Sequence, residues 1–174
     1  MTSSEPFELV STVDVILPSD YDHDQWLRQF MERRGREFVR PRIIYEKRDS
    51  FTEEVSTRLL PNQRLVADFY DITTIVSSHE CLDMIVAKNV LLLGTRGTAL
   101  LCAYATSALP EDGRYFSFNK EENLPLFSGS GESRRCIPTL VAKEEPKIAF
   151  VYFDIQHDPH RDPHRYGVVV FRSK

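Results

Sequence analysis

The residues with the clearest potential for chemistry lie in a tandem repeat, Asp-Pro-His-Arg-Asp-Pro-His-Arg, at positions 158–165. Imidazole and carboxylate groups are common ligands of zinc and iron, and a bound metal lowers the pKa of its water. A metal-assisted hydrolase is therefore one candidate function, with the metal-binding residues Asp154, His157, His160 and His164. The two prolines and the lack of a helical His-Glu-x-x-His spacing favour a simpler interpretation, a polar loop that joins two antiparallel strands.

A second group of candidate residues lies in the basic segment from Arg28 to Arg48, which follows a stretch, Met1 to Leu27, without any Lys or Arg. Guanidinium groups bind phosphates in bidentate geometry, and tyrosine can stack on a base. RNA or phosphate-ligand binding is therefore an alternative function, with the candidate residues Arg33, Arg34, Arg36, Arg40, Arg42 and Tyr45. Solvated charge at a helix end is the more common outcome of such a pattern.

Residues 119–135 are expected to form a long, mobile and exposed loop, because they contain two glycines, three serines and several charges. An apolar tetrapeptide, 124–127, lies in the middle of this loop, where a groove on a partner protein could receive it. The partner-binding candidates are Leu124, Leu126 and Phe127. The leading hypothesis is thus a non-catalytic protein–protein interaction domain, an adaptor or subunit of a regulatory or nucleic-acid-processing complex.

No motif in the sequence assigns a catalytic residue, and no cofactor is expected. Gly94-Thr95-Arg96-Gly97 resembles a phosphate-binding loop only in its glycines: it lacks the Gly-Lys-Ser/Thr ending, and a hairpin turn is expected there instead. Gly129-Ser130-Gly131 lies in a polar stretch and not between a strand and a helix. The cysteines form no Cys-x-x-Cys pair, and Cys81 and Cys102 fall on apolar stripes that are typical of a core.

The composition favours an intracellular protein, either cytoplasmic or nuclear. The 174 residues carry a net charge of −4 and only three cysteines, an odd and widely spaced set that argues against a disulfide scaffold. The first residues lack the basic and apolar layout of a signal peptide, and no apolar run reaches the roughly 20 residues that span a membrane. A local basic surface could still bind nucleic acid, although the global charge does not favour it.

The first half of the sequence alternates strand and helix patterns. Strands are expected at residues 9–17, 38–46 and 64–70, and helices at about residues 20–34, capped by Ser19, and 51–60. A third helix is expected to begin at the capping box Ser77-Ser78-His79-Glu80 and to end before Asn89.

Short strands follow one another in the second half. They are expected at residues 90–93, 98–104, 114–118, 137–143, 147–155 and 166–172. The pattern predicts an α+β fold, a mostly antiparallel sheet of about seven to nine strands with about three amphipathic helices concentrated in the N-terminal half. A single domain over residues 1–174 is expected, with a flexible tail at residues 1–7.

Overall fold

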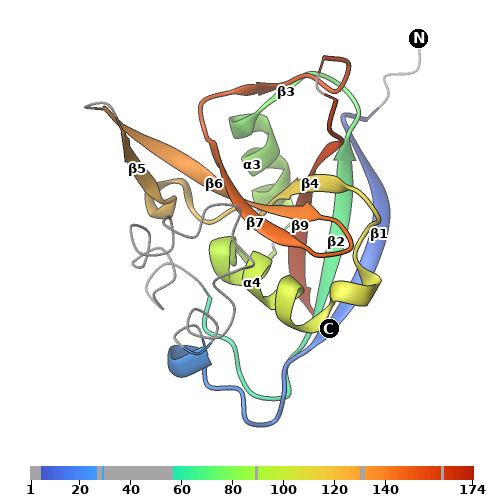
Figure 1. Ribbon diagram of the computed structural model, residues 1–174, viewed down its shortest axis with the longest axis vertical. Coiled ribbons are helices and arrows are strands. Elements are labelled where there is room, and N and C mark those ends of the chain that lie inside the picture. The colour runs from blue at the N-terminus through green and yellow to red at the C-terminus, as the bar shows by residue number, and fades with distance from the viewer. Residues whose placement is uncertain (1–4, 27–28, 30–56, 89, 130–131, 162) are drawn as a thin grey trace.

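The computed structural model describes residues 5–26, 29, 57–88, 90–129, 132–161 and 163–174. These residues form a mixed structure of helices and strands built on one large sheet (Figure 1). The α+β class expected from the sequence is therefore confirmed.

The large sheet has seven strands. In spatial order these are β1 (Phe7–Ile16), β2 (Arg64–Ile72), β9 (Tyr166–Ser173), β4 (Gly113–Phe116), β6 (Glu132–Ala142) and β5 (Leu126–Gly129), and β7 (Lys147–Tyr152) also pairs with β6. Neighbouring strands are antiparallel, except that β4 and β9 are parallel. A separate two-stranded ribbon pairs β3 (Val76–Ser77) with β8 (Gln156–His157).

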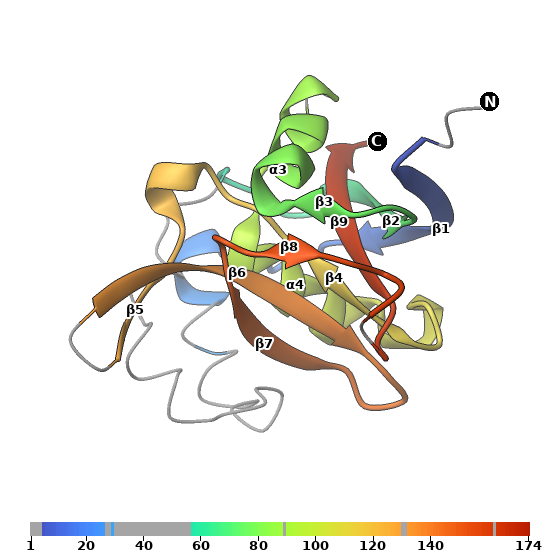
Figure 2. The same ribbon diagram turned by 90° about the horizontal axis from the view of Figure 1, so that it is seen from above.

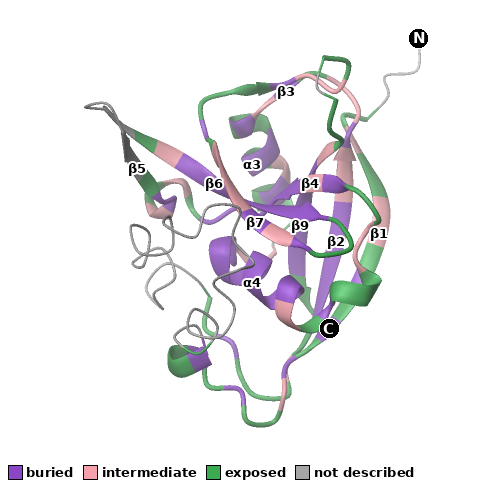
Figure 3. Ribbon diagram, in the orientation of Figure 1, coloured by how far each residue is buried: buried purple, intermediate pink, exposed green. Residues whose placement is uncertain are grey.

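Strand β9 is buried on both faces, which explains its continuous apolar run at residues 168–171. Val169 and Phe171 pack with helix α4 (Gly94–Tyr104) in one core cluster. Val168 and Val170 belong to the other cluster, together with helix α3 (Ser78–Ala87). The middle of the sheet is accordingly coloured as buried along β9 in Figure 3.

Helix α3 begins as the sequence predicts. The Glu80 N–H donates to Ser77 Oγ over 3.2 Å, and the Ser77 N–H donates to Glu80 Oε2 over 2.7 Å. These two bonds satisfy N–H groups that a helix start otherwise leaves without acceptors. The predicted apolar stripe is buried at Cys81, Leu82 and Ile85, whereas Val86 is 59% exposed.

The hairpin expected at residues 90–104 is wrong, because these residues lead into and form helix α4. Leu91 makes one bridge to Phe171, with its N–H 2.7 Å from the Phe171 oxygen, and the chain then turns at Gly94, whose φ is +51°. A short apolar run does not distinguish a buried helix from a buried strand by its periodicity. The glycines, which suggested a hairpin turn, instead start the helix.

Residues 119–135 do not form the one long loop that the sequence predicts. Its described residues form a short 3₁₀ turn, η5 (Glu121–Asn123), then strand β5, and then the first part of β6. Leu126 pairs with Arg135, and Gly129 with Glu132. The β5–β6 hairpin projects from the body of the molecule, as the two views agree (Figures 1 and 2).

The N-terminal part of the structure differs in two respects from the prediction made from the sequence. Residues 5–7 do not form a free tail: the carbonyls of Glu5 and Pro6 accept hydrogen bonds from Thr73, and β1 begins at Phe7. A helical segment begins at residue 23, and its cap is Asp22 instead of Ser19. The expected strand at 38–46 lies outside the described residues, as do most of the expected helices at 20–34 and 51–60.

The helices with defined bounds lie in the middle of the chain. Helices α3 and α4 together fall between residues 78 and 104, so the described helices are not concentrated in the N-terminal half. A second 3₁₀ turn, η4 (Thr106–Ala108), follows α4. In the described part of the chain, no helix has both the length and the apolar character needed to cross a membrane.

Candidate functional site

The arginine-rich candidates from the sequence cannot be placed in the fold. Outside the described residues lie Arg33, Arg34, Arg36, Arg40, Arg42 and Tyr45. Binding of RNA or a phosphate ligand by this segment stays a prediction.

The three apolar partner-binding candidates do not form one exposed set. Leu124 is only 4% exposed and belongs to the α3 core cluster. Leu126 is 55% exposed at the start of β5, while the side chain of Phe127 lies outside the described part of the structure. Leu124 therefore belongs to the core. Among the apolar side chains of residues 124–127 that the structure describes, Leu126 is the exposed one that a partner could contact.

The four metal-ligand candidates are not brought together. His157 is buried on β8, and its Nε2 lies 3.2 Å from Ser78 Oγ, whereas Asp154, His160 and His164 are exposed. The described residues hold no group of three or more His, Cys, Asp or Glu side chains arranged to bind a metal ion. The Ser78 hydroxyl is fully buried, so the Ser78–His157 pair offers no nucleophile to a substrate.

The first copy of the repeat forms a tight turn after β8. Asp158 accepts the N–H of His160 at Oδ1 over 2.9 Å, and its carbonyl accepts the N–H of Arg161 over 3.2 Å. The Arg161 side chain is 90% exposed and its Nε lies 3.5 Å from Asp158 Oδ2. The described residues of the repeat thus lie in a polar loop, as its prolines suggest.

This turn forms one wall of a groove. The groove has a volume of about 520 Å³, a size common among ligand pockets. Its lining residues are Ile75, Gln156, Asp158, Arg161 and Pro163.

The second copy of the repeat has a different role. The Arg165 guanidinium makes an ion pair with Asp71 on β2, and its carbonyl accepts the N–H of Arg114 over 2.8 Å. Asp71 also accepts the hydroxyl of Tyr115, which is fully buried. The two arginines of the repeat therefore make different contacts: Arg161 pairs with Asp158 within its own turn, whereas Arg165 pairs with Asp71 on β2.

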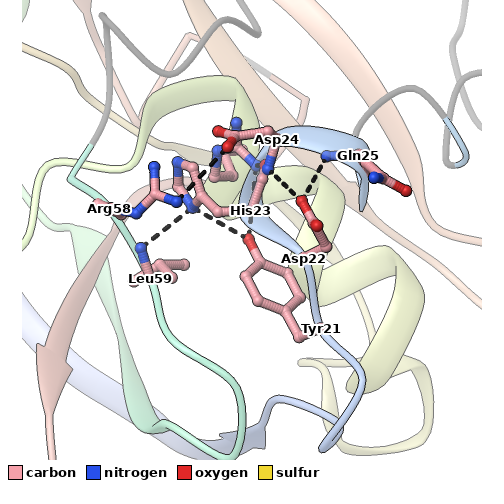
Figure 4. A network of polar contacts seen from close by, with 8 residues as sticks. Tyr21, Asp22, His23, Asp24, Gln25, Arg58 and Leu59 are labelled. Carbon is pink, nitrogen blue, oxygen red and sulfur yellow. Dashed lines mark hydrogen bonds and ion pairs between the residues drawn. The ribbon is translucent and has the colours of Figure 1, made fainter.

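A buried polar cluster lies where residues 21–26 run along helix α4. Asp22 Oδ1 accepts the N–H groups of Asp24 and Gln25 over 3.0 and 2.9 Å, which orients the start of the helical segment (Figure 4). Trp26 Nε1 donates to the hydroxyl of Tyr104 over 2.6 Å. These bonds hold residue 23 between α4 and the chain near Leu59.

The hydrogen bonds of His23 determine its tautomer. The Leu59 N–H donates to His23 Nδ1 over 3.0 Å, so Nδ1 carries no proton and the neutral ring must carry its proton on Nε2 (Figure 4). His23 is only 3% exposed. Burial, with the charges of Arg96 and Arg58, lowers the pKa of His23 to about 4, which keeps the ring neutral near pH 7.

Arg96 is the buried charge of this cluster, at 2% exposure in the first turn of α4. Its Nη1 donates to the carbonyl of His23 over 2.8 Å and lies 3.4 Å from the Tyr21 hydroxyl. Burial lowers the pKa of the Arg96 guanidinium, while Tyr21 and Asp24 act in the opposite direction. The cluster therefore surrounds a neutral imidazole with two guanidinium groups, Arg96 and Arg58, and two carboxylates, Asp22 and Asp24.

Two buried side-chain polar atoms in the described part of the chain have no hydrogen-bond partner. They are His23 Nε2 and Thr95 Oγ1. No motif in the sequence marks His23, Thr95 or Arg96 as site residues. The two glycines of the Gly94–Gly97 segment are a sequence signal for this region, but the hairpin predicted there contains no helix.

Comparison with known proteins gives no functional assignment. No protein-family model, curated protein or solved structure matches the chain.

Proposed function

We propose that the chain is a non-catalytic protein-interaction domain that binds an extended segment of a partner in the groove beside the first Asp-Pro-His-Arg copy. The observation that carries the proposal is the groove itself, about 520 Å³ in volume and lined by both apolar and charged side chains. This location replaces the β5 tetrapeptide as the centre of the interaction surface.

The register of the β3–β8 ribbon explains which side chains the groove presents. Val76 pairs with His157, and both side chains are buried beneath the ribbon. Side chains alternate between the two faces of a strand, so Ile75 and Gln156 lie on the outer face. Ile75 is 56% exposed, an apolar side chain that a partner could cover.

The charges of the groove indicate the chemistry of the partner. Arg161 is 90% exposed, and its contact with Asp158 leaves it accessible to a second carboxylate. Ile75 and Pro163 offer apolar contact in the same groove. The expected partner is an extended segment that places an apolar side chain on Ile75 and an acidic side chain against Arg161.

Selection from a random dodecapeptide library tests this proposal with a defined probe. The enriched peptides should share an apolar residue close to an acidic one, and Ile75→Asp and Arg161→Glu should each weaken their binding at least about tenfold. Val86→Asp is the matched control, because Val86 is exposed on α3 and does not line the groove. No enrichment, or equal binding by all three variants and the parent, would reject the proposal.

A charge-reversed peptide makes the test sharper. Replacing the acidic residue of a selected peptide with lysine should abolish binding to the parent chain and restore it to Arg161→Glu. If the lysine peptide does not bind Arg161→Glu while Ile75→Asp still fails to bind the parent peptide, the apolar contact acts without the proposed ion pair. The partner would then not need an acidic side chain.

A further inference from the structure

Strand β1 lies at one end of the large sheet and pairs on one side only, with β2 (Figure 1). It is ten residues long, and within the described structure no strand pairs with its outer edge. Native proteins commonly protect such an edge with lysine or proline. Residues 7–16 contain no lysine, arginine or proline, although one register shift interrupts the pairing between Leu9 and Ser11. The edge is therefore open to a further strand.

The backbone groups that face outward follow from the hydrogen bonding at the end of β1. The Leu17 N–H donates to the Gln63 carbonyl over 3.0 Å, so Leu17 directs its backbone groups toward β2. In an antiparallel pair, positions that bond to the neighbouring strand alternate with positions that do not. The N–H and C=O groups of Thr12, Asp14 and Ile16 therefore point away from β2. Such groups need partners from water or from another chain.

Two exposed apolar side chains lie along this edge. Leu9 is 52% exposed and Ile16 is 58% exposed. They lie opposite Tyr70 and Arg64 on β2, positions an even number of residues apart, so both project from one face of the sheet. Lys88 lies over the Tyr70 ring, with its Nζ 4.9 Å from the ring centre. This face of the edge thus offers apolar surface with basic groups behind it.

The charge at the start of β1 is acidic. Glu8 is exposed and makes no ion pair within the described residues. It lies opposite Asp71, which already pairs with Arg165, and it projects from the other face than its neighbour Leu9. At the far end of the strand, Asp14 pairs with Lys174. A basic side chain on an added strand would therefore find its match at Glu8.

We infer that β1 binds an extended segment of a partner protein as an additional strand of the sheet. A basic side chain of that segment lies beside Glu8, and apolar side chains cover Leu9 and Ile16. In this mode of recognition the backbone hydrogen bonds give affinity, and alternate side chains give specificity. A second copy of β1 would not supply the basic side chain, because residues 7–16 contain none.

The probe for the first experiment is a synthetic octapeptide with blocked ends, Ile-Thr-Val-Thr-Val-Thr-Leu-Lys. Its lysine would lie beside Glu8 in an antiparallel strand, and the reversed sequence serves for a parallel strand. Hydrogen exchange of the ¹⁵N-labelled full chain is followed by NMR. The amides of Thr12, Asp14 and Ile16 should exchange rapidly in the free chain, and saturating peptide should slow them at least about tenfold. If neither peptide slows these amides, the proposal is wrong.

A proline substitution tests whether the backbone of the edge makes the contact. Asp14→Pro removes one outward N–H, and proline is tolerated in edge strands where the N–H faces solvent. Peptide affinity, measured by calorimetry, should fall at least about tenfold. Asp14→Ala loses the same carboxylate but keeps the N–H, so it should bind at least about fivefold more tightly than Asp14→Pro.

The amides of Val168 and Val170 on β9 report whether Asp14→Pro is folded, since they pair with β2. They should keep their protection from exchange. Equal affinity of Asp14→Pro and Asp14→Ala for the peptide would reject strand addition.

A charge exchange at Glu8 tests the chemistry of the segment without any change to the backbone. Glu8→Lys should weaken binding of the lysine peptide by about fivefold, the effect of reversing one exposed charge pair. A peptide that ends in glutamate should then bind Glu8→Lys better than the lysine peptide does. If the parent chain binds the two peptides equally, the assignment of a basic partner is wrong.

Two other results would place the contact elsewhere. The outer edge of β7 also has no partner strand in the described structure, and peptide-induced protection at Ile148, Phe150 and Tyr152 in place of β1 would overturn the assignment. Protection of β1 that rises with the concentration of the chain alone would show that a second copy binds there, against the proposal.

This edge is separate from the peptide groove. Ile75 lines the groove and does not belong to β1, so Ile75→Asp should bind the octapeptide as the parent does. Failure of one proposal would leave the other standing.

Discussion

A Cβ atom placed on Gly97 would lie 2.5 Å from Cε2 of Phe171 and 2.8 Å from its Cζ. Only glycine allows α4 to approach β9 this closely. In an open helix, alanine would be favoured over glycine by roughly 1 kcal/mol. Here the ring contact should dominate, and Gly97→Ala should lower the free energy of unfolding by about 1–3 kcal/mol in urea titrations. Phe171→Leu should recover part of that loss; a stabilising Gly97→Ala would contradict the close packing.

The low pKa of His23 predicts acid sensitivity. Above about pH 6.5 the ring is neutral in both states, and its contribution to stability is constant. As the pH falls from about 6.5 to 4, the unfolded chain takes up a proton that the folded chain does not, so stability is lost, by about 3 kcal/mol in total. His23→Asn keeps an acceptor for Leu59 without a titrating group, and urea titrations should show a flatter pH dependence. An unchanged pH dependence in His23→Asn would contradict the role of this imidazole.

The Asp68 carboxylate predicts a second pH effect at lower pH. Burial alone would raise its pKa, but the hydrogen bonds from Arg172 and Thr12, at 2.7 and 2.8 Å, outweigh burial and lower it. Its contribution is therefore full above about pH 4 and is lost as the pH falls further.

Asp68→Asn should accordingly lower the free energy of unfolding at pH 7 by about 1–3 kcal/mol, and by less at pH 3. The matched control is Asp14→Asn, because Asp14 is 56% exposed and pairs with Lys174 at the surface. That substitution should change the free energy by less than about 1 kcal/mol. Equal losses in the two variants, measured by urea titration, would be inconsistent with a special role for the buried carboxylate.

The buried thiols predict slow chemical labelling. Burial raises the pKa of Cys81 to about 12, and Cys81, Cys102 and Cys136 are all at most 2% exposed. Thiol-disulfide reagents attack through the thiolate, so the native chain should react only at the rate of its opening and rapidly in urea. Val86→Cys, on the exposed side of the same helix as Cys81, should react at once in native buffer. Rapid labelling of the parent chain would refute the burial of these cysteines.

The parts of the fold that the sequence predicts well are those with local chemical signals. Ser77 and Glu80 have the side chains of a capping box, and α3 follows them. The apolar run at residues 168–171 is continuous because β9 lies in the middle of the sheet, and its strand type could be read without knowing its neighbours.

The errors arise where tertiary contacts decide the outcome. Residues 98–104 could be a strand or a helix by composition, and the approach permitted by Gly97 to Phe171 selects the helix. Gly129 suggested a loop, but its pairing with Glu132 makes it part of a hairpin. The partner strand is not visible in the local sequence.

The sequence does not reveal the polar cluster around His23 and Arg96, and the reason is the same. His23 and Arg96 are separated by 73 residues, and their contact depends on how the first segment lies along α4. The absence of a partner for Thr95 Oγ1 follows only from the three-dimensional arrangement. The repeat stands out in the sequence, but the sequence does not show that Arg165 pairs with Asp71 on β2 while Arg161 pairs within its own turn.

The position of β9 also bears on how the chain reaches its final form. The β1–β2 pair and the β4–β6–β7 group have no strand-to-strand ladder with each other in the described structure, since β9 lies between them. During synthesis, both groups leave the ribosome before residues 166–173 do. A nascent chain stalled upstream of Tyr166 would therefore expose two open edges and two half-covered interiors, a state that chaperones bind and that readily associates with other copies.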